Sequence, residues 1–369
     1  MILVYSYFPL FDKHLAGGMQ AWSRGLLGSL TKRGLDIQLV CPNSKLHSFP
    51  KDIKVHHILD DLEIDGLTPK RYYKNIQALK ELEKKADVIW TFDRPFPLKS
   101  NKKKVLSLGT FCYEREMKAI FQDDYDKVVV PTNYTRQQFV FYRKNIDVIP
   151  MFVESNLKKV KPNFNILKKY FNYDENKKYL LFPHRPEISK GHYDAVSILE
   201  QLLIKDSSYM LLIPKAPNSR LADVVAENEF IEQLMIYVES KGLKNNIIFH
   251  NWVDSKDMAE YLSIGSYALF FTKLPETFGI SLINCIACGT PVISYGSGAL
   301  KEVVPNGLGH YIIKDQDYTA AVDKILEGKN EKEIKRGLNY LKKYKKEKIV
   351  DSYYNILFKL ENDYRGEYE

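Results

Sequence analysis

Short apolar runs alternate with segments of helical period along most of this chain, and this alternation constrains the fold more than any other feature of the sequence. Strands are expected at 2–6, 37–41, 88–91, 105–108, 127–130 and 147–149 in the first half. Segments of helical period fill the gaps, as at 19–32 and 71–85. Strands that alternate with helices in this way form parallel sheets with crossover helices, so we expect an α/β fold.

A polar, lysine-rich stretch at 154–178 interrupts this rhythm and is interpreted as an interdomain connection. A second set of strands is expected at 179–182, 210–213, 247–249, 268–271, 291–294 and 310–313. Because 369 residues exceed the usual size of a single compact core, we expect two doubly wound domains, 1–155 and 156–346. A charged tail at 331–364 carries apolar residues with the spacing of one buried helical face.

Several features limit the class of protein. No run approaches the 18 to 20 or so apolar residues that a membrane-spanning helix needs, and the N-terminus lacks the features of a signal peptide, so we expect a cytoplasmic location. Cys285 and Cys288 form a C-x-x-C, but no second pair or nearby histidine completes a zinc site. We interpret them as core residues and expect no metal site.

The positive charge is concentrated in the first half of the chain. The net charge is +8, and residues 1–155 hold 24 Lys and Arg against 18 Asp and Glu. This excess, which includes the lysines at 99–104, is interpreted either as a solvated surface or as a surface that attracts anionic lipid or an acidic acceptor. No nucleic-acid-binding motif accompanies the charge, so nucleic acid is not an expected partner.

The most informative segment is Leu274-Pro-Glu276-Thr-Phe278-Gly279-Ile280-Ser281-Leu-Ile-Asn284, followed by Gly289-Thr-Pro-Val. An apolar strand ends near Phe271, a loop carries Glu276, and a helix is expected to begin near Thr277. Glu276 and the free amides of the first helical turn should therefore lie together at the carboxyl edge of the sheet, where ligands of open α/β sheets bind.

This segment resembles the pattern of glycosyltransferase family 4, also called glycosyl transferases group 1. The family pattern is Glu-x-Phe-Gly, a second Glu eight positions after the first, and a Gly-x-Pro-Val turn. The loop Phe182-Pro-His-Arg185-Pro-Glu-Ile-Ser-Lys190-Gly191 is similar to the family's Arg and Lys-Gly pair. Gly17-Gly18 after the first strand is similar to its Gly-Gly loop.

The resemblance implies a GT-B fold, in which two Rossmann-like domains face a central cleft. It also implies that a nucleotide-sugar donor is held mainly by residues 156–346 and the acceptor mainly by residues 1–155. The final helix, at about 347–369, is expected to pack back on the first domain.

Residue roles follow from the same resemblance. Glu276 would hold sugar hydroxyls, and Arg185 and Lys190 would clamp the donor diphosphate, where a cation at 4 Å contributes about 4 kcal/mol at an effective dielectric of 20. The other donor-binding residues would be Gly17, Gly18, Phe278, Gly279, Ile280, Ser281 and Asn284. Asn284 stands where the family usually has the second glutamate, which grips the ribose.

Three other features are interpreted as structural or as departures from the pattern. The pair Asp124 and Asp126 mimics a metal-binding acid pair but lies just before a strand. His184 and His14 have no evident acid partner for a catalytic triad. The stretch at 107–112, where the family often has a donor-contacting histidine, has none.

The expected reaction moves a sugar from a nucleoside-diphosphate sugar, with UDP or GDP, to a hydroxyl of a glycan, lipid-linked or protein acceptor. The reaction is expected to retain the anomeric configuration and to need no metal or cofactor. It would serve surface polysaccharide or glycoconjugate synthesis. Peripheral contact of the enzyme with the inner face of the membrane is a further expectation. The alternative is a non-catalytic homologue that binds sugar, glycan or a partner glycosyltransferase. A dinucleotide-dependent oxidoreductase is disfavoured because no G-x-G-x-x-G with a ribose-binding acid follows the first strand of either domain.

Overall fold

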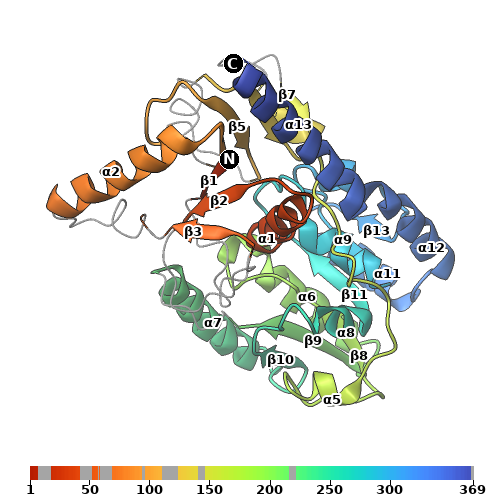
Figure 1. The fold of residues 1–369 in the computed structure, drawn as a ribbon. Coiled ribbons are helices and arrows are strands. Elements are labelled where there is room, and N and C mark those ends of the chain that lie inside the picture. The colour runs from red at the N-terminus through yellow and green to blue at the C-terminus, as the bar shows by residue number, and fades with distance from the viewer. Residues whose placement is uncertain are drawn as a thin grey trace. The chain divides into compact units, whose positions relative to one another are not determined.

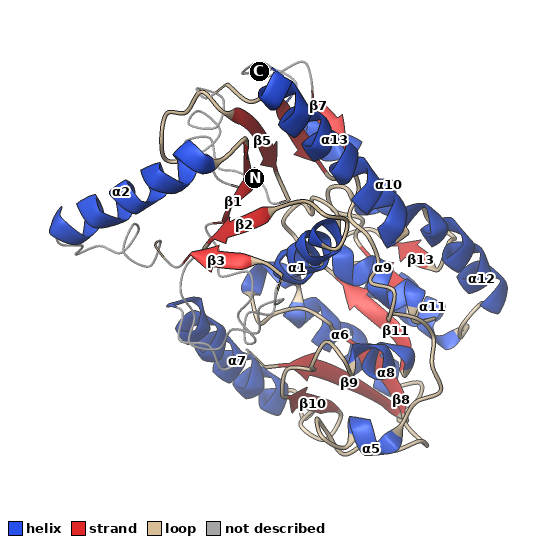
Figure 2. Ribbon diagram, in the orientation of Figure 1, coloured by secondary structure: helices blue, strands red, loops and turns tan. Residues whose placement is uncertain are grey.

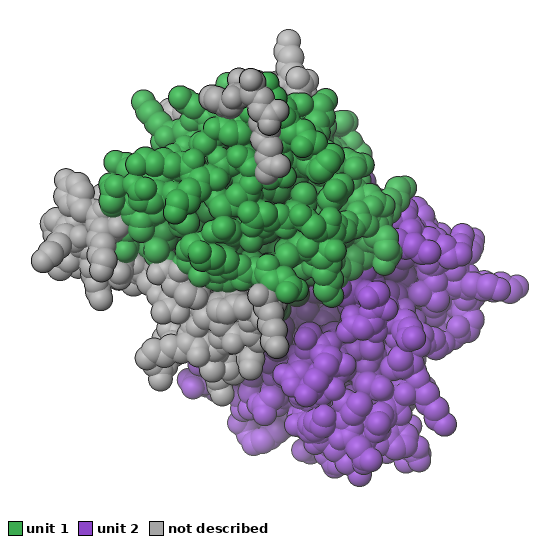
Figure 3. Space-filling view, in the orientation of Figure 1, with its two compact units in different colours: residues 1–152, 346–369 green, residues 153–345 purple. Residues whose placement is uncertain are grey.

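The computed structural model describes residues 1–6, 18–41, 52–56, 58, 69–93, 96–109, 124–139, 146–215 and 222–366. The chain divides into two compact units (Figure 3). Unit 1 comprises residues 1–152 and 346–369, and unit 2 comprises residues 153–345. The chain thus leaves unit 1 after Phe152 and returns to it at Lys346.

Unit 1 is built on a seven-stranded parallel sheet of order β3-β2-β1-β4-β5-β6-β7 (Figure 1). β1 and β4 are buried at every position, because helices cover both faces of a parallel sheet. The sequence did not indicate β3, a three-residue strand with no fully buried residue. The strands are β1 (Ile2–Ser6), β2 (Ile37–Val40), β3 (Lys54–His56), β4 (Val88–Phe92), β5 (Lys103–Ser107), β6 (Lys127–Val130) and β7 (Ile146–Val148).

The described helices of unit 1 are α1 (Gly18–Thr31), α2 (Pro69–Lys85), α4 (Asn133–Phe139) and α13 (Lys346–Gly366). α13 packs against α1, β4 and β5, although more than 190 residues separate it from the rest of the unit. Its Tyr353 lies between Trp22 of α1 and Trp90 of β4, with ring centroids 5.8 and 5.5 Å away. Aromatic packing therefore fixes the final helix on this sheet.

Unit 2 is built on a six-stranded parallel sheet of order β10-β9-β8-β11-β12-β13, shown in red in Figure 2. Its strands are β8 (Lys178–Leu181), β9 (Tyr209–Pro214), β10 (Ile247–His250), β11 (Gly265–Phe270), β12 (Val292–Ser294) and β13 (His310–Ile312). Its helices are α5 (Phe164–Leu167), α6 (His192–Leu203), α7 (Ala222–Ser240), α8 (Met258–Ser263), α9 (Ile280–Ala287), α10 (Leu300–Val303), α11 (Tyr318–Leu326) and α12 (Glu331–Tyr340). The 3-10 turns are η1 (Ile188–Lys190) and η2 (Leu341–Tyr344). The two parallel sheets confirm the expected α/β class.

The stretch at 154–178, interpreted from the sequence as a connection, packs on unit 2. Leu167 of α5 is fully buried, and Tyr170 donates its hydroxyl to Asp257 at 2.8 Å. The backbone N–H of Asn163 donates to Glu260 at 2.8 Å. The polar composition suggested a connection, but a few buried residues are enough to attach this stretch to the core of unit 2.

Candidate functional site

The two motifs of unit 2 follow adjacent strands at the point where the strand order reverses. β9 and β10 lie on one side of the β8–β11 pair, and β12 and β13 lie on the other. Arg185 and Lys190 come after β8, and Glu276 comes after β11. Ligands of open α/β sheets bind outside the carboxyl ends of the strands at such a reversal. The strand order therefore brings both motifs to the expected ligand position.

The loop after β8 approaches the end of β11 closely. Gly191 caps α6 with a φ of +82°, and a Cβ at this position would lie 2.4 Å from the carbonyl oxygen of Phe271. Only glycine fits a left-handed position with so little space. The backbone N–H of Lys273 donates to the carbonyl of Ser189 at 2.8 Å. Backbone contacts thus join the two motif loops.

Lys190 and Glu276 form an ion pair across these loops. The Nζ atom of Lys190 lies 2.8 Å from Oε1 of Glu276, and the two side chains are 21% and 23% exposed. The pair is therefore held by the fold but still open to solvent. The structure brings together two residues that lie 86 positions apart and that the sequence nominated separately.

The backbone of Glu276 is held by a second loop, which the sequence did not nominate. Glu276 forms an isolated parallel bridge with Gly298, and its carbonyl accepts from the N–H of Ala299 at 2.8 Å. Gly298 has a φ of +63°, and a Cβ there would lie 2.4 Å from the carbonyl oxygen of Glu276. The signal in the sequence was the Gly-Ser-Gly at 296–298, shortly after a strand.

Helix α9 starts at Ile280, three residues later than the sequence indicated, because Gly279 takes the left-handed N-cap position with a φ of +85°. Gly279, as the N-cap residue, has no side chain with which to cap this end of the helix. Ile280 and Ser281 form its first turn and are partly exposed, whereas Phe278 is buried against Tyr344. Uncapped first-turn amides suit a phosphate or sugar oxygen.

Asn284 lies on α9, and its side-chain oxygen is buried. Within the described part of the chain, this Oδ1 atom has no hydrogen-bond partner. An unsatisfied buried amide oxygen costs free energy that a hydroxyl donor would recover.

Arg185 and His184 occupy the same loop but differ in exposure. Arg185 is exposed, five residues before Lys190. His184 is buried against Phe270, and burial, followed by the charge of Lys190, holds the pKa of its imidazole well below the usual value. His184 is therefore a neutral core side chain.

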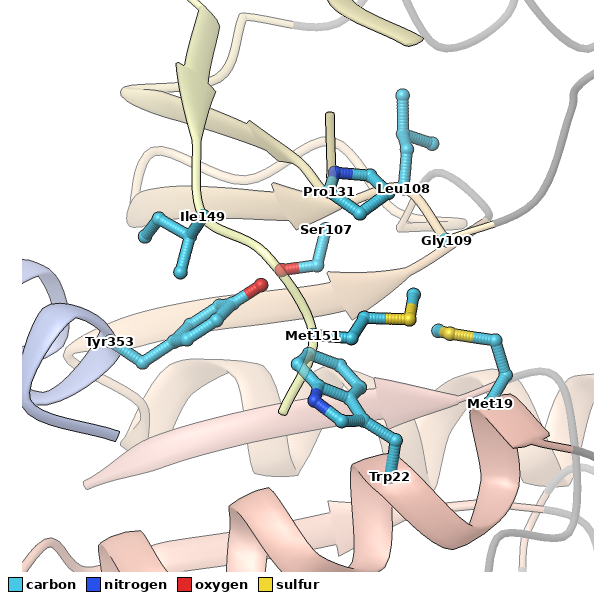
Figure 4. A pocket seen from close by; sticks show the side chains of 9 residues that line it. All are labelled: Met19, Trp22, Ser107, Leu108, Gly109, Pro131, Ile149, Met151 and Tyr353. Atoms are coloured by element: carbon cyan, nitrogen blue, oxygen red, sulfur yellow. The ribbon is translucent and has the colours of Figure 1, made fainter. Parts of the chain in front are cut away.

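Few of the nominated residues lie in unit 1. Gly18 is the first residue of α1 and is exposed, whereas Gly17 and His14 lie outside the described residues. A cavity of about 10 Å³, room for about one water molecule, lies at the carboxyl edge of the sheet (Figure 4). It is lined by Met19, Trp22, Ser107, Leu108, Gly109, Pro131, Ile149, Met151 and Tyr353. The hydroxyl of Tyr353 lies beside that of Ser107 in this view.

Asp93 is a residue of this edge that the sequence did not nominate. It follows β4, is buried, and has a φ of 57°, which is unusual for a residue other than glycine. Its Oδ1 accepts from the N–H of Gly109 at 2.6 Å, which ties the ends of β4 and β5 together. The remainder of the stretch inspected for a histidine, 110–112, lies outside the described residues.

The features interpreted as structural have structural contacts. Asp126 accepts from the N–H of Lys104 at 2.7 Å. Cys285 and Cys288 are buried, and burial raises the pKa of both thiols, that of Cys288 to about 12. Across the described ranges, no cluster of three or more His, Cys, Asp or Glu residues has a metal-binding arrangement. No helix in those ranges combines the length and apolarity needed to cross a membrane.

Comparison with known proteins identifies the family. The model of the family "Glycosyl transferases group 1" matches residues 163–348, which is half of the chain. The chain belongs to this family. This family is glycosyltransferase family 4, whose members are retaining glycosyltransferases that use nucleotide sugars and work without a metal ion. The resemblance stated from the sequence is confirmed.

Individual relatives of this group 1 chain agree with that assignment. N-acetyl-alpha-D-glucosaminyl L-malate synthase of Bacillus anthracis is 23% identical over 226 residues, which are 60% of this chain and 55% of the relative. The chain thus spans about half the length of that curated relative.

Solved structures of low identity show the fold. Sucrose-phosphate synthase of Thermosynechococcus elongatus is 18% identical with a TM-score of 0.75, covering 97% of this chain and 98% of that one. Anabaena Alr3699/HepE, in complex with UDP and glucose, is 13% identical with a TM-score of 0.75, covering 97% and 100%. The chain has the GT-B fold, as expected.

Proposed function

We propose that this chain transfers a sugar from a nucleoside-diphosphate sugar to an acceptor hydroxyl with retention of the anomeric configuration. The observation that carries the proposal is the Lys190–Glu276 pair, 2.8 Å apart at the strand-order reversal of unit 2. A cation for a leaving diphosphate and a carboxylate for sugar hydroxyls are the two groups that the donor requires side by side.

In the proposed mechanism, Arg185 and Lys190 neutralise the departing nucleoside diphosphate while Glu276 orients the sugar. Donor binding moves Lys190 from the carboxylate of Glu276 to a phosphate oxygen, which frees that carboxylate to accept from sugar hydroxyls. The leaving phosphate oxygen takes the proton of the acceptor hydroxyl on the same face of the sugar. Positioning and electrostatic stabilisation supply the catalysis, and no protein nucleophile takes part.

The start of α9 would bind the rest of the donor. The backbone of Phe278, Gly279 and Ile280, with Ser281, offers its amides to the diphosphate and the sugar. The Oδ1 of Asn284, which has no hydrogen-bond partner among the described residues, would accept a hydrogen bond from a ribose hydroxyl in place of the family's second glutamate. This arrangement supports a working donor site despite the substitution.

The proposal extends to both units and to the partners. Residues 156–346 would hold the donor, with UDP or GDP as the nucleotide. Residues 1–155, including the Gly17-Gly18 turn, would hold a glycan, lipid-linked or protein acceptor for surface polysaccharide or glycoconjugate synthesis. Such an enzyme would work in the cytoplasm, with peripheral contact to anionic lipid.

The test compares Glu276→Ala and Lys190→Ala with the wild type in excess chelator. We expect UDP-glucose or GDP-mannose to stabilise the wild type in a thermal-shift assay and to be consumed in a transfer or donor-hydrolysis assay. Each variant should lower turnover by about 10² or more, as the loss of one transition-state contact typically does. Lys314→Ala, at an exposed lysine outside the proposed site, is the control and should keep the wild-type rate.

Two outcomes would contradict the proposal. Near-wild-type turnover in both variants would remove the site assignment. Tight sugar or nucleotide binding by the wild type with no consumption of any donor would favour the alternative, a non-catalytic homologue.

A further inference from the structure

Asp194, in the first turn of α6, carries a buried carboxylate that the proposed mechanism does not use. Its side chain is 3% exposed. Its Oδ1 accepts from the hydroxyls of Tyr295 at 2.8 Å and Tyr318 at 2.9 Å, and its Oδ2 lies 3.7 Å from Nζ of Lys273. A buried carboxylate is costly unless it is paired and hydrogen-bonded, so this set of donors makes Asp194 a tightly specified group.

The three partners come from three different loops at the carboxyl edge of the six-stranded sheet. Lys273 follows β11, Tyr295 follows β12, and Tyr318 begins α11 after β13. Asp194 itself lies three residues beyond Gly191. The carboxylate of Asp194 therefore connects the loop after β8, which carries Lys190, with the loops that follow β11, β12 and β13.

One of these connections leads to Glu276. Tyr295 directly precedes the Gly-Ser-Gly at 296–298. Within it, the hydroxyl of Ser297 donates to the carbonyl of Thr272 at 2.7 Å, and Gly298 forms the bridge with Glu276. The hydroxyl of Tyr295 thus fixes the start of the loop that holds the backbone of Glu276.

A second connection leads to Lys190. Lys273, beside Asp194, donates its backbone N–H to Ser189, the residue before Lys190. Tyr318, in contrast, belongs to α11, which packs on α6. The two tyrosines make matched hydrogen bonds to the same oxygen, but only Tyr295 lies on the loop that reaches Glu276.

We propose that Asp194 is a positioning residue that acts through Tyr295 to hold Glu276 in place against Lys190. This inference rests on the proposed function, because it assigns the network to the sugar half of the donor. The diphosphate half, assigned to Arg185 and Lys190, is reached through the backbone of Lys273 and not through Tyr295.

The test compares Tyr295→Phe with Tyr318→Phe, each of which removes one hydroxyl from the same carboxylate. Calorimetry gives the affinities for UDP and UDP-glucose, with GDP and GDP-mannose as the second pair, and steady-state assays give kcat. For Tyr295→Phe we expect an affinity for UDP within about twofold of wild type. We expect kcat, and the ratio of the affinity for UDP-glucose to that for UDP, each to fall about tenfold, in line with the cost of small misplacements of catalytic groups. Tyr318→Phe should stay within about twofold of wild type in each quantity.

Asp194→Ala removes the shared acceptor and should follow Tyr295→Phe in kcat and in UDP-glucose affinity. If it does not fold, the tyrosine pair still decides the question. Equal effects of the two tyrosine variants, or an equal loss of UDP and UDP-glucose affinity in Tyr295→Phe, would overturn the proposal, because either result indicates a purely structural role.

Amide hydrogen exchange over 276–280 separates this proposal from the proposed function. Exchange should be faster in Tyr295→Phe than in Tyr318→Phe, whether or not a donor is present. Failure of the wild type to bind any of the four nucleotides would refute the proposed function and, with it, the assignment of the network to a sugar. If the wild type transfers sugar but exchange in Tyr295→Phe is no faster than in Tyr318→Phe, the positioning role alone would be refuted.

Discussion

Four histidines of unit 2 are buried, and two of them show how differently one residue type can be held. His192 packs between the rings of Phe182 and Phe230, and neither of its ring nitrogens has a hydrogen-bond partner among the described residues. His310 instead has both nitrogens bonded, one to the hydroxyl of Ser294 and one to the carbonyl of Val304, each at 2.6 Å. Burial lowers the pKa of His192 to about 3 and that of His310 to about 4.

The prediction at this scale concerns His192→Phe, with His310→Phe as the matched control. The unfolded chain protonates His192 below about pH 6.5, whereas the folded chain resists protonation down to about pH 3, so stability falls as pH drops through that window. At pH 7, His192→Phe should have the same free energy of unfolding as the wild type. Between pH 7 and pH 5, the free energy of unfolding should fall by about 2 kcal/mol less in His192→Phe than in the wild type. His310→Phe should cost about 1–3 kcal/mol at pH 7, because it leaves buried partners unpaired.

Urea unfolding followed by circular dichroism at pH 7 and pH 5 measures both effects. An unchanged pH dependence in His192→Phe would show that this histidine is not neutral in the folded state. A similar cost of the two variants at pH 7 would show that the bonding of His310 contributes no stability.

At the scale of elements, the loop after β12 meets the loop after β11 through a glycine. Gly298→Ala would place a Cβ 2.4 Å from the carbonyl oxygen of Glu276, whereas Gly307, with a φ of +81°, has open space around its Cβ position. Both substitutions carry the strain of a left-handed backbone, about 1 kcal/mol. Only Gly298→Ala should also displace Glu276, so we expect it to be the less stable variant and to lose most of its turnover.

Thermal unfolding and donor turnover of Gly298→Ala and Gly307→Ala, measured side by side, test this prediction. Gly307→Ala should lose some stability and keep its rate per folded molecule. Equal turnover in the two variants would mean that the backbone contact between Gly298 and Glu276 does not matter for the site.

At the scale of the whole molecule, the exposed lysines do not lie mainly where the sequence suggested. In the cluster at 99–104, Lys104 is buried, and Lys102 donates to the hydroxyl of Tyr364 and to the carbonyl of Lys84. Only Lys99 of its four lysines is fully exposed. Exposed lysines are denser near the end of unit 2 and the start of α13, at Lys342, Lys343, Lys345 and Lys348.

With a net charge of +8, the protein should sediment with anionic vesicles at low salt and be released as salt rises, since each surface lysine contributes about 1 kcal/mol. Replacing Lys342, Lys343 and Lys345 by glutamine should weaken sedimentation more than the same change at exposed Lys177, Lys205 and Lys314. Equal binding to neutral vesicles, or none to anionic vesicles at low salt, would remove the membrane contact from the proposed function.

Much of the fold could be predicted because its information is local. The strands β1, β4 and β6 are mostly apolar and almost entirely buried, a pattern that a sequence displays directly, and such runs recur in two sets. The three-residue β3 has no such run, and the start of α9 depends on a backbone torsion at Gly279 that the sequence does not display. Element ends therefore differ from the expected ones by up to three residues, while the order of elements held.

By itself, the sequence determined the α/β class, because apolar runs alternate with helical segments along the chain, and its resemblance to the family's motifs indicated the family and nominated Arg185, Lys190 and Glu276. Only the tertiary structure decided that Lys190 and Glu276 pair, since the strand order of the six-stranded sheet makes β8 and β11 neighbours. It alone revealed the contacts of Gly298 and Asp194. Their partners come from other loops, and contacts between residues distant in sequence exist only once the sheet has formed.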